Sequence, residues 1–127
     1  AAMREYSEPF IFFDTADRFQ RLGRLLQERG LHITKGGRFY HLLGTNDKGK
    51  AVQILKKLYT QTYTRTKLWA VGLGDSANDV PMLKQVDMPI VIRKKSGQWE
   101  PVQGIGPVVQ SAKPGPRGWA EEVLRIL

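Results

Sequence analysis

The stretch "LWAVGLGDSANDVPML", residues 68–83, joins a continuously apolar run to a polar turn and a short apolar segment. A run without polar alternation is typical of a parallel strand that is covered on both faces. Asp75 and Asp79 follow the run directly, and the carboxyl ends of parallel strands are where α/β sheets bind ligands. Gly72 and Gly74 permit a tight backbone path there. The stretch therefore predicts a parallel α/β sheet with a candidate site in its turn.

The residues around this stretch support the same architecture. Asn46 or Asp47 can cap a helix whose apolar stripe runs to about Tyr63, and "MPIVIR" is a second buried strand. A short helix after the acidic turn, a short strand at 108–110 and a closing helix complete the pattern, which is typical of α/β sheets. For the closing helix we expect one buried side, formed by Trp119, Val123, Leu124 and Leu127.

The earlier residues predict a different arrangement. "FIFF" (10–13) reads as a buried strand, and a helix follows from a cap at Asp14 to a glycine at Gly30. "LHITK" and "RFYHLL" are strand-like and are joined by Gly36-Gly37, a strong signal for a tight hairpin. We expect an α+β unit at 1–43 and an α/β unit at 44–127. Because doubly wound sheets usually carry five or six strands, both units are expected to be parts of something larger.

Composition narrows the classes of function. The 127 residues include no cysteine, which excludes disulfides and thiolate metal sites, and no apolar run approaches the length of a transmembrane helix. We expect a cytoplasmic protein with no membrane partner. The net charge is +8, but the basic residues are scattered, so we expect an anionic small substrate and no nucleic acid. A basic nucleic-acid-binding domain, with steeply salt-dependent binding, is the weaker alternative.

The carboxylates of the turn favour a hard cation. Mg²⁺ accepts one or two carboxylates and keeps waters for a substrate phosphate, so Asp75 and Asp79 are candidate ligands. Asn78 can cap the following helix or donate a hydrogen bond to a phosphate oxygen. The alternative is that Asp75 and Asn78 only form the turn and that Asp79 is an exposed acid of the first helical turn.

"GDSANDVPML" resembles the fourth motif of the haloacid dehalogenase-type phosphatases, in the branch with a G-D-x-x-N-D pattern and an inserted α/β cap. The resemblance implies that Asp75 and Asp79 hold Mg²⁺, which bridges the phosphoryl group to an aspartate nucleophile in a D-x-D motif. No two aspartates of this sequence are separated by one residue, so that motif is absent. "NDKGKAV" resembles the third motif and carries its lysine onto Lys48, with Lys50 as the rival and a helix-surface lysine as the alternative.

Three further segments, "REYSEPF", "GGRFYHLLG" and "GPRGW", resemble the mannosyl-3-phosphoglycerate phosphatase family, over the later half of such an enzyme. That family releases mannosylglycerate from mannosyl-3-phosphoglycerate. Arg38 could bind a carboxylate or phosphate with paired donors, and Gly36 and Gly37 would let backbone N–H groups approach an anion. An ordinary hairpin with a solvated arginine is the alternative.

Together these observations predict the second half of a Rossmann-like haloacid dehalogenase core plus part of an α+β cap. The expected function is that of a Mg²⁺-dependent phosphatase fragment lacking its nucleophile, with Lys48, Asp75 and Asp79 as catalytic residues. Substrate binding is assigned to Gly36, Gly37, Arg38, Lys48 and Asn78. A missing N-terminal half or a second copy is the expected macromolecular partner. The alternatives are a non-catalytic module that binds anions or a partner, and a related phosphatase for another sugar phosphate.

Overall fold

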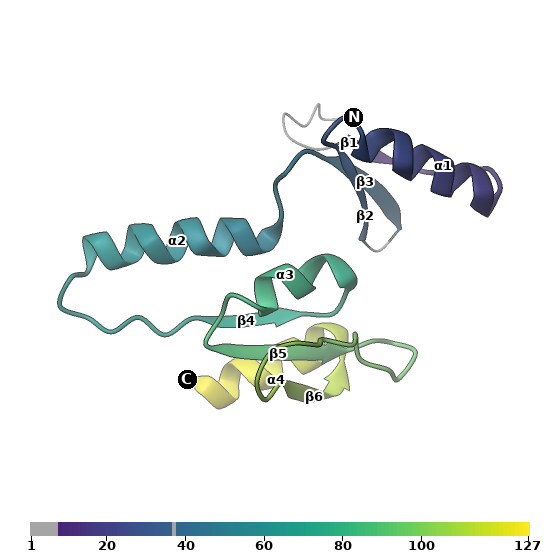
Figure 1. The fold of residues 1–127 in the computed structure, drawn as a ribbon. Helices are drawn as coiled ribbons and strands as arrows, with labels where there is room; N and C mark the ends of the chain where they lie inside the picture. Colours follow the sequence, from purple (N-terminus) through teal and green to yellow (C-terminus); the bar gives the residue numbers. More distant parts are fainter. Residues whose placement is uncertain (1–7, 37) are drawn as a thin grey trace. The chain divides into compact units, whose positions relative to one another are not determined.

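A computed structural model describes residues 8–36 and 38–127, and the chain divides into two compact units, residues 1–46 and 47–127. The first unit contains a three-stranded antiparallel sheet, and the second contains a three-stranded parallel sheet (Figure 1). The predicted fold class, α/β with a parallel sheet and an antiparallel hairpin, is confirmed.

The second unit is built on the predicted parallel sheet. Its strands are β4 (Val71–Gly74), β5 (Met88–Arg93) and β6 (Val109–Pro114), in the order β4-β5-β6. Its helical segments are α2 (Lys48–Thr62), the 3-10 turn η1 (Ala77–Asp79), α3 (Val80–Leu83) and α4 (Gly115–Ile126). In Figure 1, α3 lies beside β4, and α4 lies beside β5 and β6.

The core of this unit centres on β5, the middle strand. Ile90, Val91 and Ile92 are buried there together with Leu83 of α3, as the continuous apolar sequence predicts. Ser111 of β6 is also buried, and its hydroxyl is fully used. The hydroxyl accepts the N–H of Arg93 at 2.9 Å and donates to the carbonyl of Lys113 at 2.8 Å, where the pairing of β5 and β6 is irregular.

The predicted buried side of the closing helix is wrong. Trp119 is 51% exposed and Leu124 is 73% exposed, whereas Gly118 and Glu122 are buried. The reason is a close backbone contact: an ideal Cβ on Gly118 would lie 1.9 Å from the carbonyl oxygen of Lys113. The helix α4 therefore packs against the end of β6 through Gly118, its smallest residue. This orientation leaves Trp119 and Leu124 exposed.

The first unit is an open α+β arrangement. It comprises β1 (Glu8–Phe10), α1 (Ala16–Gln27), β2 (His32–Gly36) and β3 (Phe39–Leu43), with strand order β1-β3-β2. Aromatic rings hold α1 on the sheet: the centroid of Phe19 is 5.1 Å from that of Phe12 and 4.6 Å from that of Tyr40. None of its described residues is fully buried.

Several predicted boundaries in this unit are wrong. Only Phe10 of the predicted strand 10–13 is in β1, because pairing with β3 ends there. Phe12 packs against Phe19 of α1, and Phe13 is 89% exposed. Asp14 does not cap the helix, whose N-cap position is Thr15; its carboxylate pairs instead with Arg18 at 2.8 Å.

The hairpin of β2 and β3 is confirmed. Gly36, which was expected in the turn, is instead the last residue of β2 and pairs with Phe39. Gly37 lies outside the described residues.

In the second unit, most predicted boundaries hold to within a few residues. The cap of α2 is Asp47, whose side chain accepts the N–H of Lys50 at 2.7 Å. The predicted strand at 68–74 begins only at Val71, and the short strand predicted at 108–110 extends through Pro114. These differences lie at strand ends, which the hydrophobic pattern does not define.

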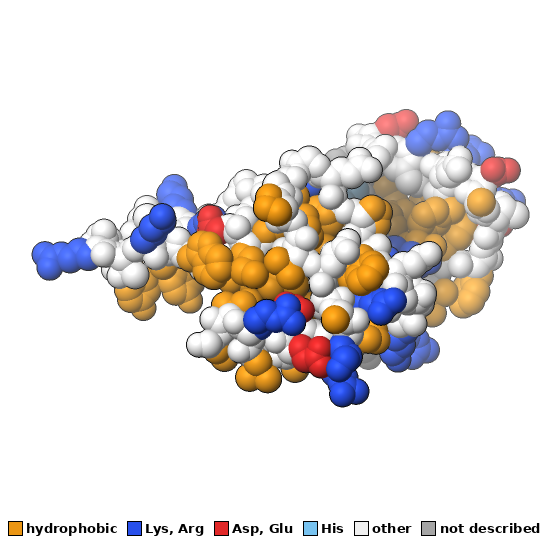
Figure 2. Space-filling model, turned by 90° about the horizontal axis from the view of Figure 1, so that it is seen from below, with side chains coloured by type: hydrophobic (Ala, Val, Ile, Leu, Met, Phe, Trp, Pro, Cys, Tyr) orange, Lys and Arg blue, Asp and Glu red, His pale blue; other side chains and the backbone are white. Residues whose placement is uncertain are grey.

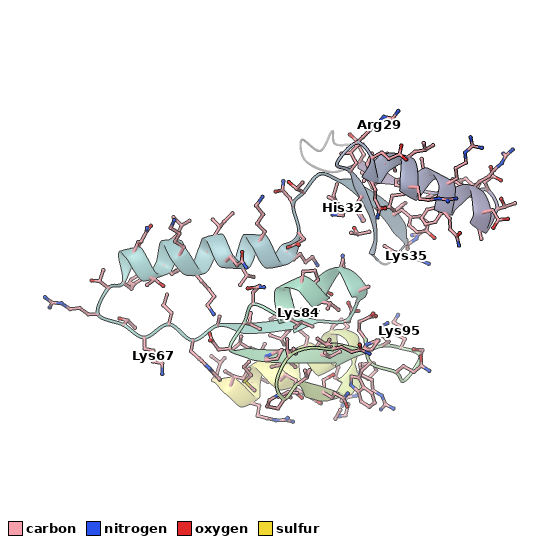
Figure 3. All side chains as sticks on the ribbon, viewed as in Figure 1. Arg29, His32, Lys35, Lys67, Lys84 and Lys95 are labelled. Carbon is pink, nitrogen blue, oxygen red and sulfur yellow. The ribbon has the colours of Figure 1, made fainter. Side chains whose placement is uncertain are left out.

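Two further observations bear on partners. No helix in the described part of the chain is both long enough and apolar enough to cross a membrane. Basic side chains of the second unit also project from separate loops: Lys67 follows α2, Lys84 follows α3 and Lys95 follows β5 (Figure 3).

Replacing Gly118 with alanine should destabilise the second unit, since the new methyl group would meet the Lys113 carbonyl. Overpacking of this kind commonly costs about 1–3 kcal/mol in the free energy of unfolding. Gly106→Ala is the matched control, because its Cβ would meet nothing within 4 Å. Denaturant unfolding of both variants measures the difference, and equal stabilities would refute the close contact.

Candidate functional site

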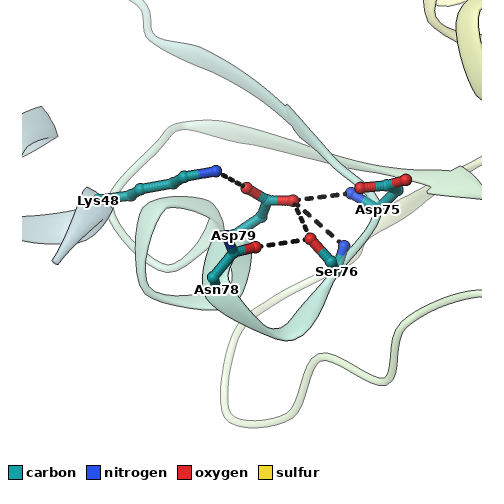
Figure 4. Close-up of polar contacts among 5 residues, drawn as sticks. All are labelled: Lys48, Asp75, Ser76, Asn78 and Asp79. Atoms are coloured by element: carbon teal, nitrogen blue, oxygen red, sulfur yellow. Dashed lines mark hydrogen bonds and ion pairs between the residues drawn. The ribbon is translucent and has the colours of Figure 1, made fainter. Parts of the chain in front are cut away.

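The candidate site lies where β4 ends and α2 begins. Asp75 follows the last residue of β4, η1 follows within the same turn, and Lys48 is the first residue of α2. The structure brings four of the predicted site residues together here: Lys48, Asp75, Asn78 and Asp79 (Figure 4). Gly36 and Arg38 belong to the hairpin of the first unit, and Gly37 is not among the described residues.

The carboxylate of Asp79 is the centre of the polar network. One oxygen, Oδ1, accepts a hydrogen bond from the ammonium group of Lys48, which forms an ion pair with it. The other, Oδ2, accepts the N–H of Asp75 at 3.1 Å, the N–H of Ser76 at 3.2 Å and the hydroxyl of Ser76 at 2.9 Å. Asp79 is only 6% exposed, so the alternative that it is an exposed first-turn acid is wrong.

These contacts decide the charge of Asp79. Burial alone would raise the pKa of its carboxyl group, because a charge is costly to remove from water. The hydrogen bonds from Lys48, Ser76 and the Asp75 N–H outweigh burial, and the attraction to the ammonium adds to them, so the pKa lies below its ordinary value. Asp79 is therefore ionised at neutral pH, and a buried anion holds Lys48 in place.

Two glycines make this geometry possible. An ideal Cβ on Gly74 would lie 2.4 Å from the Cβ of Asp79, and one on Gly49 would lie 2.5 Å from the carbonyl oxygen of Pro81. Any larger residue at either position would push the turn or α2 away. The glycine after Lys48 thus has a physical purpose, because it lets the start of α2 approach α3 closely enough for Lys48 to reach Asp79.

Ser76 is a member of the polar network that sequence reasoning missed. Its hydroxyl lies 2.6 Å from Oδ1 of Asn78 and 2.9 Å from Oδ2 of Asp79, so its single hydrogen can be donated to one of them at a time. Its position before η1 is a signal that could have found it, since serine is a preferred residue at helix starts. Asn78 lies inside η1 and accepts from Ser76, which places it in the turn rather than at the predicted cap.

A pocket of about 410 Å³ opens beside this turn. Asp75 and Asp79 supply its carboxylates, and the exposed side chain of Asp75 borders it. Its other walls come from β4, β5 and the start of α4: Leu73, Gly74, Ile92, Gly115, Pro116 and Trp119. Sequence reasoning assigned Trp119 mainly to the core, and its position on the pocket is explained by the close approach of α4 at Gly118.

The donor set fits a magnesium ion in part. No hydrogen bond or ion pair to the Asp75 carboxylate is found within the described residues, so Asp75 can offer oxygen to a cation. Both oxygens of Asp79 already accept hydrogen bonds, and a metal on Oδ1 would compete with Lys48. The described residues contain no group of three or more histidines or acids placed to bind a metal. Mg²⁺ needs only one or two carboxylates when waters and a phosphate complete its shell.

The remaining candidates lie apart from this network. Arg38 is exposed at the hairpin, with its guanidinium carbon 5.9 Å from the centroid of the Phe39 ring. No hydrogen bond or ion pair of its guanidinium group is found within the described residues. Lys50, the rival of Lys48, donates its backbone N–H to the cap residue Asp47.

Replacing Asp79 with asparagine should lower the free energy of unfolding at neutral pH by about 1–3 kcal/mol, because it removes a buried hydrogen-bonded charge. Since the pKa of Asp79 is lowered on folding, its contribution is present above the ordinary carboxyl pKa and is lost as pH falls through the folded-state pKa. The wild-type chain should therefore lose more stability than Asp79→Asn between about pH 5 and pH 2.

The measurement is urea unfolding across that pH range. Asp75→Asn removes the exposed carboxylate of the same turn and should lose little free energy of unfolding. Parallel pH profiles for the wild-type chain and Asp79→Asn would contradict the ionised, paired state of Asp79.

Comparison with known proteins finds similar sequences. No protein-family model matches the chain. The chain is similar over its whole length to proteins of Persephonella marina (46% identical) and Methanococcoides burtonii (37% identical), both named glucosyl-3-phosphoglycerate/mannosyl-3-phosphoglycerate phosphatase. Over 72% of its length it is 38% identical to the mannosyl-3-phosphoglycerate phosphatase of Pyrococcus horikoshii.

The chain spans less than half the length of these relatives: 46% of the first two and 35% of the third. The part that it matches is their C-terminal half. The whole of this chain is therefore similar to the C-terminal half of proteins that are named as phosphatases of glucosyl- or mannosyl-3-phosphoglycerate.

Proposed function

We propose that the chain supplies the lysine and the acidic turn of a Mg²⁺-dependent phosphatase that acts on a glycosylated 3-phosphoglycerate. The observation that carries this proposal is the Lys48–Asp79 ion pair beside the exposed carboxylate of Asp75, at the carboxyl end of a parallel strand. The names of the relatives supply the substrate class, since all three are phosphatases of glucosyl- or mannosyl-3-phosphoglycerate.

The proposed roles follow from the environment of each side chain. Asp75 and Asp79 would hold Mg²⁺, with the exposed Asp75 as the readily available ligand. When bound, the ion would supply positive charge against the phosphoryl oxygens. Lys48, fixed by Asp79, would add a second positive charge, and Asn78 would orient a phosphate oxygen. Such catalysis relies on positioning and electrostatics.

An aspartate nucleophile is the further requirement that the family resemblance implies. The 127 residues contain no D-x-D pair, so we infer that this residue comes from the part of the fold that the relatives carry beyond the matched region. The chain by itself should therefore release no phosphate.

Replacing Asp75 with asparagine should abolish phosphatase activity and weaken Mg²⁺ binding, because it removes the available carboxylate. The assay protein is a fusion of this chain behind the unmatched first half of the P. marina relative. Phosphate release from glucosyl- and mannosyl-3-phosphoglycerate is measured while Mg²⁺ is titrated. Asp17→Asn, an exposed acid on α1, is the control and should behave as the unmodified fusion.

Lys48→Ala in the same fusion separates the effect of the lysine charge from that of the Mg²⁺ charge. It should lower kcat by roughly 10²–10³, as removal of one preorganised electrostatic donor does, with less change in Mg²⁺ affinity. Full activity of the Asp75→Asn variant would show that Asp75 is not a metal ligand. An unmodified fusion that is folded but inactive would overturn the proposed function.

Arg38→Ala tests which part of the substrate the first unit recognises. We propose that the exposed guanidinium binds the glycerate carboxylate, and a charged hydrogen bond of about 1.5–3 kcal/mol corresponds to a loss of roughly 10- to 150-fold in kcat/KM. Hydrolysis of an aryl phosphate, which has no carboxylate, should change little. Arg38→Lys should recover only part of the loss, because an ammonium group cannot reproduce paired donors.

The matched control for Arg38 is Arg21→Ala, which removes an exposed arginine from α1 of the same unit. Equal losses on the glycosylated phosphoglycerate and the aryl phosphate would make Arg38 a structural residue of the hairpin.

A further inference from the structure

Trp119 is a large side chain of the pocket to which the proposed roles give no task. It is 51% exposed and lines the same pocket as Asp75 and Asp79. Within the described residues, its indole N–H donates no hydrogen bond and its ring contacts no other ring or cation. Figure 2 views the molecule from the lower side of Figure 1, where α4 lies, and shows hydrophobic side chains on the surface of the second unit.

The other two tryptophans have different surroundings. Trp99 is held by the fold, because its indole N–H donates to the carbonyl of Ser111 at 3.1 Å and its ring centroid lies 4.9 Å from the guanidinium carbon of Arg93. Trp69 is 59% exposed, but it precedes β4 and does not line the pocket. Trp119 therefore combines an unengaged indole ring with a place beside the acidic turn.

The packing of α4 fixes Trp119 in this position. Gly118 lies against the carbonyl of Lys113, and Glu122, one helical turn later, is buried with its carboxylate 3.0 Å from the guanidinium of Arg125. These contacts set the rotation of α4 about its axis, so that Trp119 cannot turn into the core. The indole ring is thus placed at the pocket before any ligand binds, which lowers the cost of binding.

The chemistry of the proposed substrate brings its sugar close to this ring. In a glycosylated 3-phosphoglycerate, the phosphate occupies carbon 3 of glycerate, and the hydroxyl left for the glycosidic bond is on carbon 2. The sugar and the phosphate are therefore attached to adjacent carbons. If the phosphoryl group lies at Asp75, the sugar lies within reach of the walls of the same pocket. A volume of about 410 Å³ is in the usual range for such ligands.

We propose that Trp119 is a specificity residue that packs its indole ring against the C–H face of the glycosyl ring. The proposal rests on the proposed function, because that function places the phosphate at the acidic turn. An aromatic ring offers a flat apolar surface to sugar C–H groups, and the indole N–H remains available to a sugar hydroxyl. Trp119 contacts no reacting atom, so its contribution is to binding and orientation.

This contact suits a site that accepts more than one sugar. Two of the relatives are named as phosphatases of both glucosyl- and mannosyl-3-phosphoglycerate. Glucose and mannose differ in the orientation of one hydroxyl group, and a site that hydrogen-bonds that hydroxyl would discriminate strongly between them. Packing against C–H groups depends little on it. Loss of the Trp119 ring should therefore affect both sugars by a similar factor.

The test uses Trp119→Ala and Trp119→Phe in the fusion with the unmatched first half of the P. marina relative. Trp119→Ala should lower kcat/KM for both glycosylated substrates about tenfold, mainly through KM, and Trp119→Phe should recover most of the loss. Hydrolysis of 3-phosphoglycerate, which is the same molecule without the sugar, should change little. Leu124→Ala is the matched control, because Leu124 is 73% exposed on the same helix and does not line the pocket.

Binding of mannosylglycerate provides a second readout that needs no turnover. Saturation-transfer NMR should detect contact between the sugar C–H protons and the unmodified fusion, and Trp119→Ala should raise the Kd at least about fivefold. Unchanged mannosylglycerate binding in Trp119→Ala, equal losses with and without the sugar, or an equal effect of Leu124→Ala would each overturn the proposal. An inactive fusion that binds mannosylglycerate through Trp119 would refute the phosphatase and leave the sugar contact standing.

Discussion

A buried carboxylate that must stay ionised organises the second unit. Asp79 is removed from water, and its oxygens are satisfied by donors from the start of α2 and from the turn after β4. Breaking such a pair by removing one partner is costly because it leaves a charge without compensation. The helix, the strand end and the turn are therefore positioned by one anion. The same residue explains the glycine at position 74, because a Cβ there would lie 2.4 Å from the Cβ of Asp79.

Sequence reasoning succeeded where a residue type has one strong physical role. The buried strand "MPIVIR", a helix cap at Asn46 or Asp47 and a hairpin of two strands were predicted, and the structure contains all three, because burial, capping and glycine turns act locally. It failed where a distant backbone contact decides the outcome. Nothing in the pattern of α4 reveals that Gly118 contacts the Lys113 carbonyl, so Trp119 was placed in the core instead of on the pocket.

The prediction of the candidate site also succeeded only in part. Asp75, Asn78 and Asp79 were identified from the polar turn after the strand, and Lys48 from its resemblance to a family motif. The structure brings the four together, but the prediction gave Asp75 and Asp79 the same role as metal ligands. The folded turn makes them different, with Asp79 buried and hydrogen-bonded on both oxygens and Asp75 exposed beside the pocket. This difference arises from which carboxylate the backbone N–H groups of the turn reach, and a linear sequence does not contain that information.

The aromatic contacts of the first unit have a thermodynamic consequence. A unit of 46 residues in which no described residue is fully buried gains little free energy from its own core. Any molecule that binds only its folded form adds to its stability, by about 2.7 kcal/mol at a concentration 100 times the Kd. Part of the binding energy of such a ligand is then consumed in ordering the hairpin and α1. Measured affinity would understate the strength of the contacts themselves, and resistance to proteolysis would rise with ligand concentration.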